Sequence, residues 1–440
     1  MTPPVLPGRL PLVGHALTLV RRPLELMSGA DPDDDIAVLY GGWQPWYLVS
    51  SPELAQQIFV EDARKFDRGM IFEAVARIVG KTSLTADGDL HRQRRRLVQP
   101  TLDRRRIPEY APTMASAAHD LVASWRDGER LPLDDLLNDF SFEVVTRTLV
   151  TAGIDEARVA DFKRYLPPAL AGITKSMYDP TGLMRHIPTP DNRRTNHAIR
   201  QVRATIADAV AYLRTSGEDH GDMLSTLVRD GHGLSDQEIC DEAMALLVAG
   251  TETITSALSW AIHLMTESPE VQQRVQVELD EVLSGRPITV GDVPKLDYLR
   301  RMFTEILRLY PPGWLVSRRT LTEVRLGDVV VPARRPVFVC LYTLHRRKEN
   351  FPDPDRFDPD RWLPERAKSL PREAYLPFST GMHRCPGDHF AWTMASVLLA
   401  ALCQRWHLTA AGDPITPTAA PTLRPSHLDV IVTSRGADRD

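Results

Sequence analysis

Apolar residues recur at spacings of three and four along much of the chain, the spacing that places side chains on one face of a helix. From Pro52 to about Asp230 the sequence therefore predicts helices separated by Gly, Pro and Asp. The clearest of them are Ala115–Trp125, Phe140–Thr151 and Ala198–Thr215. We expect a predominantly helical protein.

The best-defined helix is predicted to begin after Ser235, because Ser235 and Glu238 form a capping-box pattern. It runs to the stop at Pro269. Its middle, Ala243–Ala249, is apolar on every side, so we expect that part to be buried all round. Further helices are predicted from Pro269 to Ser284, over Tyr298–Tyr310 and over Asp388–Trp406.

A smaller part of the chain has the composition of β-strands. Ile36–Tyr40 and Trp46–Val49 flank a glycine pair, and Glu323–Leu326 and Val329–Val331 alternate around the turn pair Gly327-Asp328. We expect β-rich parts at about 36–50 and 315–343. No composition shift marks a boundary, so residues 1–440 are predicted to form a single domain.

Composition excludes several classes of protein. The 440 residues are 43% hydrophobic and 25% charged, and Lys+Arg 53 against Asp+Glu 58 gives a net charge of −5, which favours no nucleic acid or lipid partner. Apolar stretches such as Val397–Cys403 are shorter than the ~20 residues that span a bilayer. We expect a cytoplasmic protein with no signal peptide and no membrane anchor. The cysteines are too few for a disulfide framework: Cys240, Cys340, Cys385 and Cys403.

One cysteine has distinctive surroundings. Cys385 directly precedes the last helix, where free backbone N–H groups favour a thiolate. Gly381 and Gly387 allow tight turns and close approach to a flat partner, and Phe378 is placed to screen the sulfur from water. The alternative is an ordinary buried cysteine between turn glycines. Zinc is disfavoured, because only His383 and His389 are near enough to complete the ligand set.

The stretch F-x-x-G-x-H-x-C-x-G, from Phe378 to Gly387, resembles the haem-binding signature of the cytochrome P-450 monooxygenases. The resemblance implies that Cys385 is the axial ligand of the iron of haem b. It also implies the P-450 fold, which is mainly α with a small β portion. That fold is a triangular helical prism, with the haem between the long central helix and the helix that follows the cysteine loop.

Glu305 and Arg308 resemble the family's E-x-x-R motif, and Arg356 lies in a segment that resembles its second arginine element. Alone, an i, i+3 pair is usually a solvated surface bridge. Apolar neighbours of the pair favour burial instead. The resemblance implies one structural network of Glu305, Arg308 and Arg356 that braces the cysteine loop.

A glycine in a helix interior costs about 1 kcal/mol, and Gly250 lies in the middle of the long predicted helix. One explanation is a close helix contact at Gly250, with the Thr253 hydroxyl bonded to a carbonyl one turn earlier. The resemblance implies another. The helix opens beside the haem at Ala249 and Gly250, Thr253 donates a hydrogen bond to bound O2, and Glu252 and water supply protons.

The family also places basic residues against the haem propionates. His91 and Arg95 share one helix side at i, i+4, and they match the family's propionate-binding pair. Arg318 and His383 align with two further contacts of this kind. Negative propionates facing these four groups would give a sensible charge balance.

The implied reaction inserts one atom of O2 into a substrate C–H or C=C bond. The chain has no G-x-G-x-x-G motif, so electrons from NAD(P)H are expected to arrive through a separate ferredoxin and its ferredoxin reductase. The basic cluster Arg92, Arg94, Arg96 and Arg104–Arg106 is the hypothetical docking face for an acidic ferredoxin.

The substrate is expected to be largely apolar. Three short motifs, P-L-V-G-H-A-L, H-R-Q-R-R and C-P-G-D-H-F, are similar to those of bacterial terpene-tailoring members. This similarity ranks a terpenoid ahead of a fatty acid, macrolide or steroid as the substrate. Family topology implies that the substrate pocket is lined by apolar side chains: Met70, Ile71, Phe72, Ala245, Val248, Leu315 and Val316.

Three other functions compete with oxygenation. A non-catalytic haem sensor would not need Glu252 and Thr253, and a peroxide-driven enzyme would favour an arginine in place of Thr253. A Mg²⁺-dependent diphosphate enzyme would use an acidic cluster, here Asp134, Asp135 and Asp139. The same acidic residues fit a capped helix start equally well.

Overall fold

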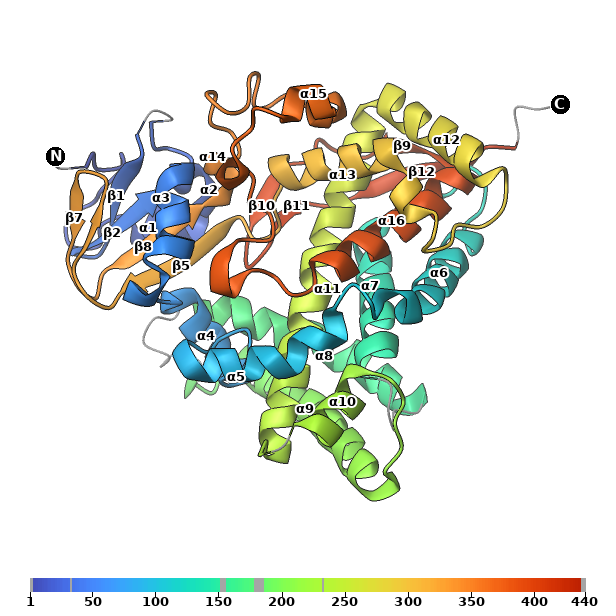
Figure 1. Ribbon diagram of the computed structural model, residues 1–440, viewed down its shortest axis with the longest axis horizontal. Coiled ribbons are helices and arrows are strands. Elements are labelled where there is room, and N and C mark those ends of the chain that lie inside the picture. Colours follow the sequence, from blue (N-terminus) through green and yellow to red (C-terminus); the bar gives the residue numbers. More distant parts are fainter. Residues whose placement is uncertain (1–2, 32–33, 151–155, 178–185, 232, 437–440) are drawn as a thin grey trace.

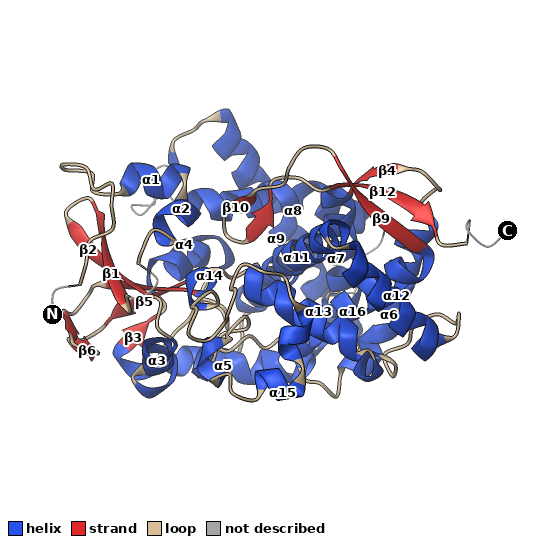
Figure 2. Ribbon diagram, turned by 90° about the horizontal axis from the view of Figure 1, so that it is seen from above, coloured by secondary structure: helices blue, strands red, loops and turns tan. Residues whose placement is uncertain are grey.

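In the computed structural model, a body of packed helices carries small β-sheets at its two ends (Figures 1 and 2). The structure describes residues 3–31, 34–150, 156–177, 186–231 and 233–436. The longer helices are α4 (Gly69–Val79), α5 (Gly88–Val98), α6 (Ile107–Ala123), α7 (Leu133–Leu149), α8 (Glu156–Met177), α9 (Pro190–Ser216), α11 (Asp236–Glu267), α12 (Pro269–Leu283), α13 (Asp297–Leu309) and α16 (Asp388–Arg405). The shorter ones are α1 (Ala16–Arg21), α2 (Pro23–Met27), α3 (Pro52–Gln56), α10 (Met223–Asp230), α14 (Leu341–Leu344) and α15 (Pro364–Ala367).

Helix α11 runs through the middle of the body (Figure 1) and packs against α7, α9, α12, α13 and α16. Ser235 is its N-cap, and Ser235 and Glu238 form the predicted capping box. The predicted all-round burial holds from Ala243 to Leu247, whereas Val248 and Ala249 are half-buried. Helix α11 is also long and apolar enough to cross a membrane, but 72% of its most apolar 18-residue stretch is buried inside the fold.

The other predicted helices are present with small shifts of their ends. Helix α6 begins earlier than the predicted Ala115, and α7 covers the predicted Phe140–Thr151 only to Leu149. Thr151 lies outside the described residues. These shifts follow from tertiary packing, because both helices bury an apolar face in the main core.

The larger sheet has the strand order β1-β2-β8-β5-β3. β1 and β2 are the predicted strands near residue 40, and β8 pairs with β2 in parallel after a long crossover. β5 carries Arg318 and lies against α4, so the sheet brings that arginine to the helical body. The strands are β1 (Ile36–Gly41), β2 (Gln44–Val49), β3 (Phe66–Asp67), β5 (Leu315–Thr320) and β8 (Pro336–Cys340).

The predicted hairpin is present as β6 (Val324–Leu326) and β7 (Val329–Val331). No local pattern predicted the strands that follow α16. There β12 (Asp429–Ser434) pairs with both β9 (Trp406–Ala411) and β4 (Arg130–Pro132), and β10 (Pro417–Ala419) pairs with β11 (Leu423–Pro425). These strands are short, and several of them contain proline. They pair only because distant segments of the chain fold against them, which local sequence patterns do not reveal.

Candidate functional site

The loop from Phe378 to Gly387 folds back on itself just before α16. The Cys385 N–H donates to the Phe378 carbonyl at 2.9 Å, and the Gly387 N–H donates to the sulfur. Gly381 has φ +69°, and a Cβ there would lie 2.1 Å from the Phe59 carbonyl oxygen. Only glycine therefore allows the loop to close against residue 59, and this closure sets the position of Cys385.

Burial raises the pKa of the Cys385 thiol, and the Gly387 N–H and Arg95 counteract it only in part. The expectation that the helix end alone favours a thiolate is therefore wrong for the bare polypeptide, since desolvation outweighs the local dipoles. A metal cation bound to the sulfur would reverse this balance, because coordinated thiols are deprotonated. The chemistry of the donor thus fits an iron ligand.

Beside the cysteine loop, Arg68, His91 and His383 lie in direct contact. Arg68 Nη2 donates to His383 Nδ1 at 2.8 Å. Because that nitrogen accepts, it carries no hydrogen, and His91 Nε2 must be the donor in the 3.2 Å contact with the same atom. The imidazole rings are 4.2 Å apart between centroids. Segments before α4, on α5 and before α16 thus converge on one point.

Arg95 and Arg318 complete this cationic cluster. Burial and the neighbouring arginines lower the pKa of His91 to about 4, and that of His383 falls far below its usual value for the same reasons. Burial, together with the Arg318 charge, lowers the pKa of Arg68 to about 9. Both imidazoles are therefore neutral at pH 7, because burial and the positive charge of the neighbouring arginines both disfavour protonation.

The cluster holds more positive charge than its own acids compensate. Asp87 is the nearby carboxylate: it accepts from the Arg68 N–H at 3.3 Å and lies 3.7 Å from His383 Nε2. Arg68 Nε and His91 Nδ1 are buried with no hydrogen-bond partner in the part of the chain that the structure describes. The unprotonated His91 Nδ1 needs a hydrogen-bond donor, whereas the Arg68 Nε–H calls for an anionic partner. A ligand with two carboxylates would supply this anionic partner.

The structure brings together the four predicted propionate contacts, His91, Arg95, Arg318 and His383, and adds Arg68. Arg68 is only 6% exposed, and its guanidinium lies over the Phe72 ring at 4.5 Å. Sequence reasoning missed it because Phe66-Asp67-Arg68-Gly69 has neither helical spacing nor a basic run. Only the folded structure shows that Arg68 lies beside His383 and Phe72.

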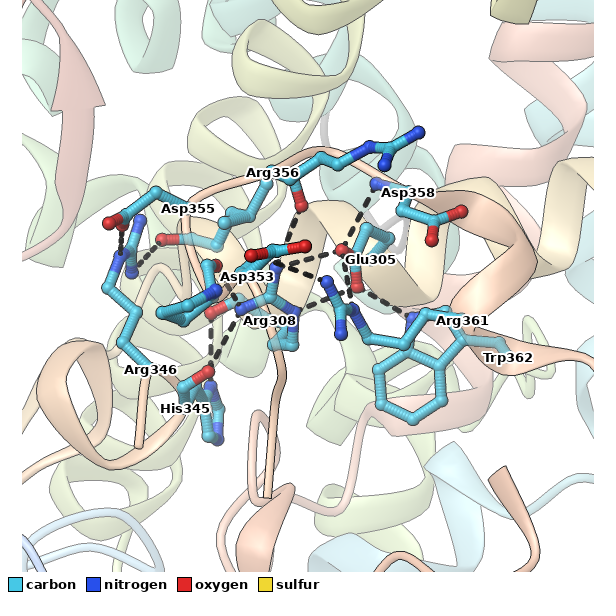
Figure 3. A network of polar contacts seen from close by, with 12 residues as sticks. Glu305, Arg308, His345, Arg346, Asp353, Asp355, Arg356, Asp358, Arg361 and Trp362 are labelled. Atoms are coloured by element: carbon cyan, nitrogen blue, oxygen red, sulfur yellow. Dashed lines mark hydrogen bonds and ion pairs between the residues drawn. The ribbon is translucent and has the colours of Figure 1, made fainter. Parts of the chain in front are cut away.

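Glu305 and Arg308 form the predicted buried pair (Figure 3). Both side chains are 0% exposed, and Arg308 donates through Nε and Nη2 to the two carboxylate oxygens, each at 2.8 Å. Trp362 Nε1 also donates to Glu305 at 2.8 Å, and Arg308 Nη1 donates to the carbonyls of His345 and Pro354. The carboxylate is thus surrounded by donors, as a buried charge requires.

The expected role of the Arg356 side chain in this network is wrong. Arg356 contributes its backbone carbonyl, which accepts from Arg308 Nη2 at 3.3 Å, while its side chain is exposed and points away from Glu305 (Figure 3). Arg361 takes the expected place, with Nε 3.2 Å from a Glu305 oxygen. The backbone turns after Arg356, so the guanidinium that reaches the carboxylate comes from five positions further along.

A family model described as Cytochrome P450 matches residues 3–430, nearly the whole chain. This chain belongs to the cytochrome P450 family. The cysteine loop, the cationic cluster and the buried Glu305–Arg308 pair are the features of the structure that agree with this membership.

Relatives refine the assignment of this cytochrome P450. Cyclooctat-9-en-7-ol 5-monooxygenase of Streptomyces melanosporofaciens is 39% identical over 407 residues, covering 91% of this chain and 88% of that protein. Pentalenene oxygenase of Streptomyces avermitilis is 34% identical over 436 residues, covering 98% and 97%. The haem domain of cytochrome P450DA matches with a TM-score of 0.88 at 23% identity, covering 99% and 98%, which confirms the fold. The chain is a P450 monooxygenase.

The residues present fit a haem. Cys385 is placed to hold the iron, and the cluster of Arg68, His91, Arg95, Arg318 and His383 is placed to bind the propionates. When bound, the thiolate-ligated haem supplies O2 activation and the oxidising power of the P450 reaction. The polypeptide supplies orientation, exclusion of water and proton delivery.

Helix α11 is helical without interruption from Asp236 to Glu267, so the expected opening at Ala249 and Gly250 is absent as a break in secondary structure. A Cβ at Gly250 would lie 3.1 Å from Val145 Cγ2 of α7, which supports the close helix contact as the reason for this glycine. Thr253 Oγ1 donates to the Ala249 carbonyl at 2.6 Å. The Thr253 proton is thus committed, and its oxygen is free to accept a hydrogen bond rather than to donate one.

Glu252 has a partner that the sequence did not reveal. Arg424 Nη2 of β11 lies 3.3 Å from a Glu252 oxygen. Burial raises the pKa of Glu252, and Arg424 lowers it. Both residues line a cleft of about 300 Å³ that also contains Asp139, Lys163 and Thr251. The carboxyl therefore lines this cleft, one residue before Thr253 on the same helix.

The predicted substrate-pocket residues lie on α4, α11 and β5. α4 carries Met70, Ile71 and Phe72 and lies against both β5 and α11. Of the predicted set, Ala245 is 1% exposed within the main core, so it lines no wall. The remaining side chains are half-buried: Met70, Ile71, Phe72, Val248, Leu315 and Val316.

The competing metal sites receive no support. In the described part of the chain no group of three or more His, Cys, Asp and Glu side chains is arranged to hold a metal ion. Asp134 lies in the first turn of α7 and accepts from the Leu428 N–H at 2.8 Å. Its carboxylate therefore ties the helix start to the segment before β12, which is the structural alternative to Mg²⁺ binding.

Proposed function

We propose that this P450 inserts one atom of O2 into an apolar terpenoid of secondary metabolism. The observation that carries the proposal is the 39% identity to cyclooctat-9-en-7-ol 5-monooxygenase over 91% of this chain. The similarity to pentalenene oxygenase adds a second terpene-modifying relative. The half-buried apolar side chains on α4 and β5 are consistent with a substrate held by shape rather than by charge.

Within this proposal each site residue has a defined task. Cys385 would hold the haem iron, and Phe378, Gly381 and Gly387 shape the loop around it. The Arg68 cluster binds the propionates. Glu252 takes up protons from the solvated cleft, and Thr253 accepts a hydrogen bond in the oxygen-binding region beside Ala249 and Gly250. Glu305, Arg308 and Arg361 have a purely structural role.

The electrons are proposed to come from NAD(P)H through a ferredoxin reductase and a ferredoxin in the cytoplasm. The docking face needs one correction, because Arg94 is only 3% exposed and pairs with Glu238 and Glu242. Arg106 is half-buried and donates to the Gly221 carbonyl. The surface available to an acidic partner is formed by exposed arginines: Arg92, Arg96, Arg104 and Arg105.

Spectral titration of the purified haem-loaded protein tests the substrate class. Terpenes, fatty acids, macrolides and steroids are added separately, and we expect a shift of the haem spectrum to high spin at the lowest concentration with a cyclic terpene. Phe72→Ala should weaken terpene binding, whereas Val330→Ala, on the distant β7, should not. Tighter binding of another class would replace the terpenoid. Haem reduction without product from any bound compound would favour the sensor.

A further inference from the structure

The chain between α4 and α5 is bounded by two glycines whose φ angles are positive. Gly80 has φ +79° at the end of α4, and Gly88 has φ +59° at the start of α5. A Cβ at Gly88 would meet no atom within 4 Å, so the backbone conformation and not crowding favours glycine there. Such positions can absorb the change of backbone angle when a segment swings. We call residues 80–88 the α4–α5 segment.

Hydrogen bonds inside the α4–α5 segment make it a compact unit. Thr85 Oγ1 donates to the Gly80 carbonyl at 2.7 Å and accepts from the Thr82 N–H at 2.9 Å. The Ala86 N–H donates to the Thr82 carbonyl at 2.8 Å. Because both partners of each bond lie within the segment, rotation at its two end glycines would move it as one body.

One carboxyl group of α11 holds the middle of this segment. Glu242 lies against Ser83, with one oxygen 2.8 Å from the Ser83 nitrogen and the other 2.8 Å from Ser83 Oγ. The Glu242 side chain is only 1% exposed. A neutral carboxyl suits these contacts, because its O–H can donate to the Ser83 hydroxyl while the other oxygen accepts from the Ser83 N–H. Burial favours this neutral form and raises the pKa of Glu242 to about 7.

The charged groups that face Glu242 compensate an ionised carboxylate only in part. Arg94 of α5 has its Nε 3.9 Å from a Glu242 oxygen, but the same guanidinium also pairs with Glu238. On α11, Asp241 adds a like charge and is itself paired with Arg203 of α9 at 2.6 Å. These carboxylates thus share two arginines. Ionised Glu242 therefore gains from contact with water, which it obtains only if the α4–α5 segment moves away.

The two ends of the segment lie beside two different parts of the molecule. Asp87 accepts from the Arg68 N–H at 3.3 Å and lies 3.7 Å from His383 Nε2, within the cluster placed to bind the haem propionates. Before the other end, Ile78 lines a cavity of about 530 Å³. Arg203 lines the same cavity and donates to the Ile78 carbonyl at 2.6 Å. The segment thus extends from the edge of this cavity to the cationic cluster.

We propose that the contact between Glu242 and Ser83 is a proton-controlled latch on the α4–α5 segment. With Glu242 neutral, the segment is held closed on α11. When Glu242 ionises, its carboxylate turns to water, Ser83 is released, and the segment rotates about Gly80 and Gly88. Opening connects the cavity beside α4 with the haem side and admits small apolar molecules. The effect on access rests on the haem site proposed above, whereas the motion itself does not.

Hydrogen–deuterium exchange of the haem-loaded full chain tests the latch. Peptides covering residues 80–88 are followed at pH 6 and pH 7.5, and protection is expressed relative to an unstructured peptide at the same pH. Because the closed state binds the proton more tightly, wild-type protection should fall about eightfold between these pH values. Glu242→Gln should show no fall. Glu267→Gln, at an exposed carboxylate of the same helix, should behave like the wild type.

A second variant separates the hydrogen bond from the charge. Ser83→Ala removes the hydroxyl but leaves the carboxyl buried, so protection should be lower than in the wild type at both pH values while the fall with pH remains. Stopped-flow binding of n-butyl isocyanide, a neutral apolar haem ligand, measures access. Its rate in the wild type should rise from pH 6 to pH 7.5 in step with exchange, and in Glu242→Gln it should not depend on pH.

The haem spectrum of each variant confirms that it is folded. Equal protection of the wild-type segment at the two pH values would overturn the latch, and so would an undiminished fall in Glu242→Gln. Exchange that depends on pH beside an isocyanide rate that does not would overturn the role in access. Spectral titration with terpenes at one pH is independent of these results, so failure of the latch leaves the proposed function standing.

Discussion

Arg68 Nη2 lies 2.8 Å from Nδ1 of His383, although 315 positions separate the two residues. The contact links the segment before α4 to the loop that carries the candidate iron ligand, two residues after His383. Arg68 therefore connects the part of the chain nearest the predicted substrate wall with the part that holds the haem.

Replacing Arg68 should weaken haem retention. Arg68→Met removes a buried cation from the propionate cluster, and charge-assisted hydrogen bonds of this kind are the strong ones, so haem loss should be about tenfold faster. Transfer of haem to apomyoglobin measures the rate. The matched control is Arg64→Met, at an exposed arginine four residues earlier, which should not change it. Equal loss rates in the two variants would contradict the role of Arg68.

Arg361 and Arg356 should contribute differently to the stability of the buried Glu305–Arg308 network. Arg361→Met deprives Glu305 of a charged donor and should lower the free energy of unfolding by about 2–3 kcal/mol. Arg356→Met should change it by less than about 0.5 kcal/mol, because that side chain is exposed. Urea unfolding of the haem-loaded proteins measures both. A larger effect at Arg356 would restore the role expected from the sequence.

Arg424 should control when Glu252 loses its proton. Burial raises the Glu252 pKa and Arg424 lowers it, so Arg424→Met should raise that pKa further and move deprotonation to higher pH. Infrared spectra report the protonated carboxyl, and the band is assigned by its absence in Glu252→Gln. Arg435→Met, whose arginine pairs with Asp280 instead, is the control. An unchanged midpoint in Arg424→Met would refute the coupling.

Glu242 should give a distinctive pH dependence of stability. Burial raises its pKa to about 7, against hydrogen bonds from Ser83. The folded state then binds the proton more tightly than the unfolded state, so this group's stabilising contribution falls as pH rises from about 4.5 to about 7. In Glu242→Gln that fall of up to about 3 kcal/mol should be absent.

Unfolding midpoints at pH 5 and pH 7.5, compared between wild type and variant, measure the Glu242 effect. The exposed Glu281 offers the control, since Glu281→Gln should leave the wild-type pH dependence intact. Parallel pH curves for wild type and Glu242→Gln would show that the carboxylate is ionised throughout.

Electron delivery should depend on the exposed arginines near α5. Reversing Arg104 and Arg105 to Glu should slow reduction by an acidic ferredoxin and flatten its dependence on salt. Arg126→Glu, beyond the far end of α6 and about 25 Å away at 1.5 Å per residue, is the control. Stopped-flow reduction under carbon monoxide measures the rate. Identical rates for all the proteins would place the docking face elsewhere.

Local sequence signals predicted those parts of the molecule that local interactions determine. The capping box of α11 and the hairpin around Gly327 act within a few residues, and the structure contains them. The family signature added Cys385 and the basic residues near it. The sequence therefore predicted the family and a candidate site.

Features set by distant contacts could not be predicted in the same way. Arg68 and Arg424 stand alone in sequence, and each acquires its partner only when a remote segment folds against it. The sequence pattern indicated Arg356, but spacing along the chain does not tell which way a loop turns a guanidinium. In the folded protein it is Arg361 that reaches Glu305. The thiol of Cys385 was misjudged for a similar reason, since burial depends on the whole fold.

The contact between Gly250 and Val145 ties two positions on neighbouring helices to each other's size. A Cβ at 250 would come within 3.1 Å of a Val145 methyl, so the space at one position is set by the volume at the other. Alanine at 250 would require Val145 to shift by a few tenths of an ångström, so it should be better tolerated when residue 145 is smaller. In a randomised library, the two codons should thus be recovered as a correlated pair, and attempts to reshape the oxygen-binding turn must redesign α7 at the same time.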